Sequence, residues 1–195
     1  MNFIKNVIGL TGLYCSGKST VEKYLEKKYG FFIIDVDRLG HVSLNEKKEK
    51  LIAMFGEMIV SSDGKIDRKI LGNIVFSDKN KLAMLNSVVH PFIVQKTVEM
   101  METSEKENIC INAALLFEMG LYKYCKKIVV VKSPVLSIIK RGMKRDNNSI
   151  LKILKILSSQ KVLSLAKKNR ESAEIFYINN DSNPEKLEKL TDEIM

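Results

Sequence analysis

The chain has 195 residues, a length that fits one core domain with a subdomain or a lid. It is 45% hydrophobic and 28% charged, which is ordinary for a globular protein, and no run approaches the roughly 18 apolar residues of a membrane helix. The net charge of +9 suits a polyanion such as a nucleotide, a coenzyme or nucleic acid, or is simply a lysine-rich surface. The cysteines are too few and too scattered for a disulfide framework or a zinc site, so we expect a reduced, cytoplasmic protein.

A strand is predicted at residues 7–10, and a complete phosphate-binding loop follows it. The loop has the pattern G-x-x-x-x-G-K-[ST] and consists of Gly12, Leu13, Tyr14, Cys15, Ser16, Gly17, Lys18 and Ser19. Its glycines allow a tight turn whose N–H groups face phosphate oxygens, and the helix after it directs the positive end of its dipole at an anion. We therefore expect these residues and Thr20 to bind ATP. Lys18 would reach the β- and γ-phosphates, and Ser19 would hold Mg²⁺ together with phosphates and water.

Four more strands are predicted, at residues 31–34, 109–114, 128–131 and 175–178. Helical patterns lie between them, and this alternation is typical of an α/β fold with a parallel five-stranded sheet flanked by helices. Ligands of such sheets bind beyond the carboxyl ends of the strands. The loop lies at that edge, as do Asp35 and Asp37 after the second strand. Either carboxylate is a candidate for chemistry at the acceptor, and the alternative is that Asp37 only caps the next helix.

A helical insertion separates the second and third strands. Helices are expected at residues 47–55, at 67–76 with Asp67 as the N-cap, and from 79 towards 102. A simple crossover between strands needs only one helix. The insertion is therefore large enough to be a lobe that binds a second substrate.

A basic helical pair is predicted after the fourth strand. Pro134 opens a helix that carries Arg141 and Arg145, which share one face because they are four residues apart. Polar residues at 146–149 end this helix, and a strongly apolar helix with interspersed lysines follows from residue 150. We expect the pair to form a lid. A loop at 179–184 then leads into a last helix that begins at Pro184.

A kinase fits these features better than two other classes of protein. Residues 37–40 are formally the D-x-x-G of a GTPase, but they follow the loop too closely for a switch segment, and the chain has no Asn-Lys-x-Asp for guanine. A nucleic-acid-binding protein is disfavoured because aromatic residues make up only 7% and form no stripe with basic residues. A kinase needs bound phosphates, Mg²⁺, positive charge on the transferred group and a carboxylate near the acceptor, and the chain offers candidates for each.

Segments along almost the whole chain resemble the dephospho-CoA kinase family. The phosphate loop is shared by many families, but DVDRLGH at 35–41 resembles this family's D-A-D-x-x-x-H, and AALLFE at 113–118 resembles its P-L-L-F-E. Ile66-Asp67-Arg68 and His90-Pro91 resemble its acceptor lobe. Arg141, Arg145 and Gln160 resemble its lid. The order of these segments is more specific than any one of them.

This resemblance implies a P-loop kinase that uses ATP and Mg²⁺ to phosphorylate the ribose 3′-hydroxyl of dephospho-CoA, the last step of coenzyme A synthesis. Asp35 would act as general base or orient the hydroxyl. Three basic residues would also be catalytic, because they would stabilise charge on the transferred group: Lys18, Arg141 and Arg145. A nucleoside or nucleotide kinase of similar fold is the alternative.

The acceptor site and the partners are also implied by this resemblance. Arg68 and His90 would join Asp35 in binding the acceptor, or else be structural. We expect one P-loop kinase domain over 1–195, with a core at 1–36, 106–135 and 171–195, an acceptor-binding lobe at about 37–105 and a lid at about 136–170. We expect no partner among nucleic acids or membranes, and a monomer or weak homo-oligomer.

Overall fold

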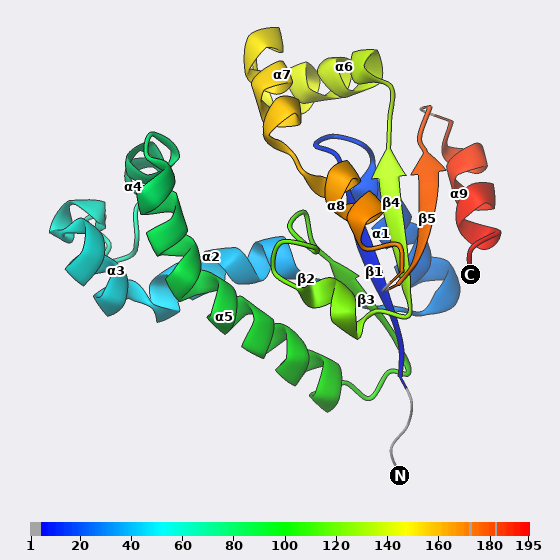
Figure 1. Ribbon diagram of the computed structural model, residues 1–195, viewed down its shortest axis with the longest axis horizontal. Helices are drawn as coiled ribbons and strands as arrows, with labels where there is room; N and C mark the ends of the chain where they lie inside the picture. The colour runs from blue at the N-terminus through cyan, green and yellow to red at the C-terminus, as the bar shows by residue number, and fades with distance from the viewer. Residues whose placement is uncertain (1–4, 172, 182) are drawn as a thin grey trace. The chain divides into compact units, whose positions relative to one another are not determined.

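The computed structural model describes residues 5–171, 173–181 and 183–195, and the chain divides into two compact units. The first unit joins Met1–Asp35 to Thr103–Met195, and the second is Val36–Glu102. Each unit has its own cluster of buried apolar side chains. Figure 1 shows the course of the chain through both units.

The first unit is built on a five-stranded sheet. Neighbouring strands are all parallel, in the order β2-β3-β1-β4-β5. The predicted α/β fold with a parallel five-stranded sheet is therefore confirmed. The strands are rich in valine and isoleucine, as strands that are covered on both faces usually are. Their bounds are β1 (Asn6–Gly12), β2 (Phe32–Asp35), β3 (Asn108–Asn112), β4 (Lys127–Lys132) and β5 (Glu174–Asn179).

Helices of the first unit flank this sheet. α1 and α9 pack against each other and share a buried apolar cluster with the strands, which includes Leu10, Leu25 and Val129 (Figure 1). A helix at 162–168 was not predicted, because only Gln160 and Lys161 separate its apolar run from that of the helix before it. The helical elements are α1 (Lys18–Tyr29), η2 (Leu121–Tyr124), α6 (Val135–Asp146), α7 (Ile150–Ser159), α8 (Val162–Lys168) and α9 (Pro184–Asp192).

The second unit is helical. The predicted helices at 47–55, 67–76 and 79–102 are present, and a further helix directly follows β2. Asp67 is an N-cap as predicted, since its carboxylate accepts from the backbone N–H groups of Lys69 at 2.8 Å and Ile70 at 3.0 Å. Leu51, Ile59 and Leu71 are in its buried cluster. The elements are α2 (Val36–Glu46), α3 (Lys48–Phe55), η1 (Glu57–Ile59), α4 (Arg68–Phe76) and α5 (Lys79–Thr103). Within the described ranges, no helix combines the length and the apolar character needed to cross a membrane.

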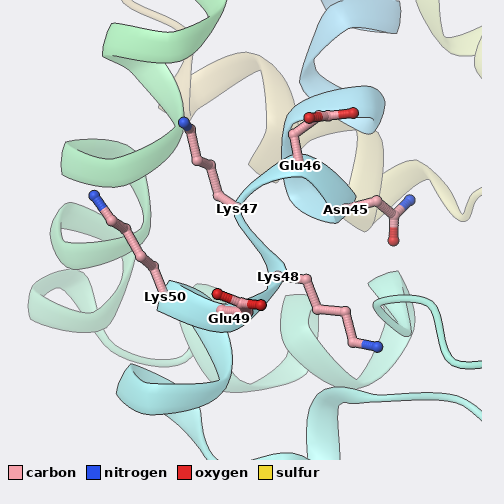
Figure 2. Close-up of a pocket in the computed structure, with 6 residues that line it drawn as sticks. All are labelled: Asn45, Glu46, Lys47, Lys48, Glu49 and Lys50. Atoms are coloured by element: carbon pink, nitrogen blue, oxygen red, sulfur yellow. The ribbon is translucent and has the colours of Figure 1, made fainter.

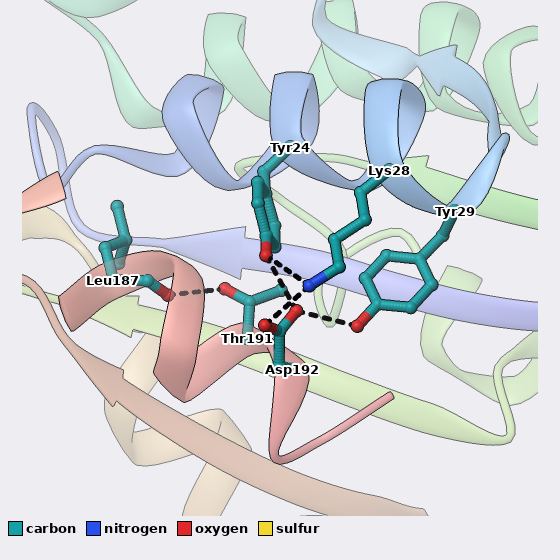
Figure 3. A network of polar contacts seen from close by, with 6 residues as sticks. All are labelled: Tyr24, Lys28, Tyr29, Leu187, Thr191 and Asp192. Atoms are coloured by element: carbon teal, nitrogen blue, oxygen red, sulfur yellow. Dashed lines mark hydrogen bonds and ion pairs between the residues drawn. The ribbon is translucent and has the colours of Figure 1, made fainter. Parts of the chain in front are cut away.

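A polar network joins α1 to α9 in the first unit. Asp192 of α9 accepts hydrogen bonds from the hydroxyl groups of Tyr24 at 2.8 Å and Tyr29 at 2.7 Å, and from the amino group of Lys28 at 2.7 Å (Figure 3). Lys28 and the two tyrosines hold the pKa of Asp192 down at about 2. The network thus fastens the C-terminal helix to the helix that follows the phosphate loop.

We predict that Asp192→Asn lowers the melting temperature at pH 7 by a few degrees, because three donors lose a charged acceptor. The folded pKa lies below the ordinary value, so the carboxylate stabilises the fold above pH about 4, and this contribution is lost as the pH falls towards 2. The difference between wild type and variant should shrink over that window in thermal melts. Glu193→Gln, an exposed neighbour on the chain, is the control. A difference that is constant from pH 7 to pH 2 would contradict the role of the charge.

Candidate active site

The phosphate loop connects β1 to α1, and two of its residues have left-handed backbone conformations. Gly17, directly before α1, has φ of 99°, and Cys15 has φ of 51°. A Cβ atom at position 17 would also collide with the side-chain amide of Asn180. Glycine is therefore required at 17 by its backbone and by its surroundings. Cys15 holds a conformation that is unusual for a residue with a side chain, a feature that often accompanies a functional loop.

Side-chain donors bind two carbonyl groups of this loop. The guanidinium of Arg141 donates to the carbonyl of Cys15 at 3.0 Å, and the amide of Asn180 donates to the carbonyl of Ser16 at 2.8 Å. Ser133 links the two donors, since its hydroxyl accepts from Arg141 at 3.1 Å and donates to the carbonyl of Asn180 at 2.6 Å. The first N–H groups of a helix have no partner within the helix and are suited to bind an anion. Arg141 and Asn180 thus hold the carbonyl side of a loop whose N–H side can receive phosphate.

Ser16 adds a buried hydroxyl to the loop. It is 1% exposed, and in the part of the chain that the structure describes its Oγ has no hydrogen-bond partner. Most buried hydroxyl groups have a partner, and leaving one without costs about 1–3 kcal/mol. A phosphate oxygen at the loop would accept from this hydroxyl. Its burial therefore fits a loop that holds a phosphate group.

The ammonium group of Lys18 is bound at the end of β3. Its Nζ donates to Oδ1 of Asn112 at 2.5 Å, and Nδ2 of Asn112 donates to the carboxylate of Glu22 on α1. Asn112 is the last residue of β3 and is 4% exposed, so a buried amide orients the lysine. Asn112 and Glu22 were not predicted as site residues. A polar residue that ends an otherwise apolar strand at the ligand edge is the signal that could have identified Asn112.

Asp35 ends the neighbouring strand, β2, and is aligned with Asn112 in the pairing of β2 with β3. Its side chain is exposed. Burial of Glu22, together with the negative charge of Asp35, raises the pKa of Glu22 above its usual value. The structure thus brings the predicted Asp35 to the same strand ends as the lysine of the phosphate loop.

The two arginines of α6 that were predicted for the lid have different partners at the loop. Arg141 binds the carbonyl of Cys15, whereas Arg145 forms two hydrogen bonds of 2.8 Å with Asp146 and lies 5.3 Å from the ring centre of Tyr14. Both arginines therefore contact the loop, but Arg141 contacts its backbone and Arg145 an aromatic side chain.

The predicted acceptor residues Arg68 and His90 belong to the second unit. Arg68 is exposed at the start of α4. His90 is half-buried in α5, and its burial lowers the pKa of the imidazole. Asp37, the second candidate carboxylate, for which capping of the next helix was the alternative, lies in the first turn of α2, which begins at Val36.

A hollow of about 390 Å³ lies in the second unit at the turn between α2 and α3. Figure 2 shows the side chains that line it, with Lys47 and Lys48 leaving the turn in different directions. Lys48 donates to the carbonyl of Gly64 at 2.5 Å, and the amino group of Lys47 lies 4.6 Å from the ring centre of Phe92. Both lysines therefore make contacts within the second unit. The lining residues are Asn45, Glu46, Lys47, Lys48, Glu49 and Lys50, and the predicted acceptor residues are not among them.

Comparison with known proteins identifies the family. A family model described as dephospho-CoA kinase matches residues 6–186. The dephospho-CoA kinase of Borreliella burgdorferi is 43% identical, with 94% of this chain and 89% of the relative covered, and that of Fusobacterium nucleatum is 40% identical, with 94% and 93% covered. Among solved structures, a protein from Thermus thermophilus gives a TM-score of 0.81 at 29% identity, with 97% of this chain and 96% of that chain covered. The dephospho-CoA kinase from Campylobacter jejuni gives 0.64 at 27% identity, with 98% and 96% covered. The chain therefore belongs to the dephospho-CoA kinase family and is a kinase, as the sequence predicted.

We predict that Lys18→Ala lowers kcat about a hundredfold or more while the melting temperature stays near that of wild type, because the lysine would stabilise phosphate charge in the transition state. ADP release measured by a coupled assay reports kcat. Lys23→Ala, an exposed lysine on the same helix, is the matched control and should retain wild-type kcat. Near-wild-type turnover in Lys18→Ala would exclude the role of the lysine.

Proposed function

We propose that this kinase transfers the γ-phosphoryl group of ATP to the ribose 3′-hydroxyl of dephospho-CoA, giving coenzyme A and ADP in the last step of coenzyme A synthesis. The placement of Lys18 and Asp35 around Asn112 is the observation that carries this proposal. It puts a phosphate-binding cation and an exposed carboxylate at adjacent strand ends. Membership of the dephospho-CoA kinase family supports the identity of the acceptor.

Asp35 is proposed to hold the acceptor hydroxyl. Phosphoryl transfer has a loose transition state in which the attacking oxygen needs little early deprotonation, so orientation of the hydroxyl is the larger contribution. An exposed carboxylate at the end of β2 is accessible to a substrate. It would accept the hydroxyl proton as the new P–O bond forms.

The charge of the transferred group is proposed to be stabilised from two sides. Lys18 and the N-terminal N–H groups of α1 would bind the phosphates from the loop. Arg141 and Arg145 would add positive charge from the lid, and both already contact loop residues. The loop residues Gly12, Leu13, Tyr14, Cys15, Ser16, Gly17, Lys18, Ser19 and Thr20 are proposed to surround the ATP phosphates.

Mg²⁺ is proposed to enter with ATP. The donors present fit a metal that is held mainly by phosphates and water, since Mg²⁺ keeps much of its hydration shell and needs few protein ligands. Among the described residues, no group of three or more His, Cys, Asp or Glu side chains could hold a metal. Ser19, exposed in the first turn of α1, would supply one hydroxyl ligand. Bound there, the ion would neutralise charge on the phosphates.

The second unit is proposed to bind the acceptor through Arg68 and His90. The exposed guanidinium of Arg68 suits the pyrophosphate of dephospho-CoA. Burial lowers the pKa of His90 and so favours the neutral imidazole, which can both donate and accept a hydrogen bond. We also propose a cytoplasmic protein that is a monomer or weak homo-oligomer and binds no nucleic acid.

An acceptor panel tests the reaction. We predict ADP release from ATP with dephospho-CoA, and much slower release with nucleosides and nucleoside monophosphates, in a coupled assay at equal acceptor concentrations. The acceptor-free reaction is the background control. A nucleotide kinase is the alternative that the panel would detect: release with a nucleoside monophosphate and none with dephospho-CoA would overturn the proposal.

Substitutions of Asp35 and Asp37 distinguish a chemical role of Asp35 from an effect on the local structure after β2. We predict that Asp35→Asn lowers kcat about a hundredfold with little change in KM for ATP, because a neutral amide holds the hydroxyl less firmly than a carboxylate does and cannot accept its proton. Asp37→Asn, two residues later in the first turn of α2, is the matched control and should lower kcat only slightly. A severe Asp37→Asn with a mild Asp35→Asn would reverse the assignment.

A further inference from the structure

Four parts of the lid meet at one residue of the phosphate loop, Tyr14. Its ring packs against α6 at Gly142, where a Cβ atom would lie 3.0 Å from the ring. Its hydroxyl donates to the carboxylate of Asp146 and accepts from the amide of Asn148 at 3.0 Å. Its backbone N–H donates to Oε1 of Gln160 at 2.9 Å. Backbone, ring and hydroxyl of this residue are thus all engaged by the lid.

Asp146 connects Tyr14 to Arg145. One oxygen, Oδ2, accepts from both the tyrosine hydroxyl and an N–H of Arg145, and the other accepts from Nε of Arg145 at 2.8 Å. These two donors hold the pKa of Asp146 down at about 2, so the carboxylate is charged throughout the neutral range. Residues 136–170 contain ten lysines and arginines and this single acidic residue. The one negative charge of the lid is therefore placed between Arg145 and the phosphate loop.

The guanidinium of Arg145 is fixed from two directions. Asp146 accepts two hydrogen bonds from the edge of the guanidinium. The central carbon of the guanidinium lies 5.3 Å from the ring centre of Tyr14, within the range of a cation–π interaction. A two-pronged carboxylate contact restricts the orientation of the guanidinium plane, and the ring restricts its position. Arg145 is otherwise a long side chain with 58% exposure, which on its own would sample many rotamers.

We propose that Tyr14 is a positioning residue that, through Asp146, holds Arg145 at the phosphate loop for phosphoryl transfer. This inference rests on the proposed function, because it assumes that Arg145 stabilises the transferred group. The hydroxyl of Tyr14 acts through the arginine and not on the substrate, so it should matter only while Arg145 is present. Orientation of a catalytic cation before the reaction contributes mainly to kcat.

The test is a mutant cycle of Tyr14→Phe and Arg145→Ala, with kcat and KM measured for ATP and dephospho-CoA. We expect Tyr14→Phe to lower kcat about tenfold, the loss that follows removal of one hydrogen bond to a charged group. Little change is expected in either KM. Arg145→Ala should lower kcat more, and adding Tyr14→Phe to it should cost nothing further.

Tyr24→Phe is the matched control. It also removes a tyrosine–aspartate hydrogen bond in the first unit, between Tyr24 of α1 and Asp192 of α9 (Figure 3). It should lower the melting temperature and leave kcat unchanged. A purely structural role for Tyr14 would give the same pattern as this control.

Three results would overturn the inference: wild-type kcat in Tyr14→Phe, a Tyr14→Phe loss that persists in full in the Arg145→Ala background, or wild-type kcat in Arg145→Ala. The last would also remove the arginine from the proposed mechanism. Failure of the proposed function itself is distinguishable, because the wild-type protein would then release no ADP with dephospho-CoA in the same assay.

Discussion

A phosphate loop that directs its N–H groups at an anion points carbonyl groups the other way, and donors to those carbonyl groups hold its shape. For two carbonyl groups of this loop the donors are side chains from distant parts of the sequence. Arg141 of α6 binds the carbonyl of Cys15, and Asn180, just after β5, binds that of Ser16. Ser133 couples the two. The shape of the loop therefore depends on α6 and on the residue that follows the last strand. Contacts made far along the chain set the conformation of residues near its beginning.

The strand order places the ends of β3 and β2, with Asn112 and Asp35, beside this loop. Because β3 lies between β2 and β1, its terminal Asn112 stands between Asp35 at the end of β2 and the loop that follows β1. Asn112 binds Lys18 and is aligned with Asp35. A sheet order in which β1 and β2 were neighbours would leave no strand end between the two groups. The charges proposed to bind phosphate and to face the acceptor are thus arranged by the strand order, through Asn112.

The sequence predicted the strands, the phosphate loop and the parallel sheet because each depends on local pattern. The cap at Asp67 was predicted for the same reason. Asn112, Glu22 and Asn180 were not predicted, since their roles come from contacts across 90 or more positions of the chain. The different partners of Arg141 and Arg145 also require tertiary structure, because helical spacing shows only that they share a face. The start of α2 at Val36 does not follow from the local pattern either, because β2 runs directly into α2 without a linking residue.

The most direct test of the account is the position of the new phosphate in the product. Phosphorus NMR of the reaction of ATP with dephospho-CoA, catalysed by the wild-type protein, reports where the phosphoryl group is attached. The account predicts one new phosphomonoester signal, coupled to the proton on the ribose 3′ carbon, together with ADP in equal amount. A phosphate on any other atom of the acceptor, or ADP formed without a phosphorylated acceptor, would contradict it.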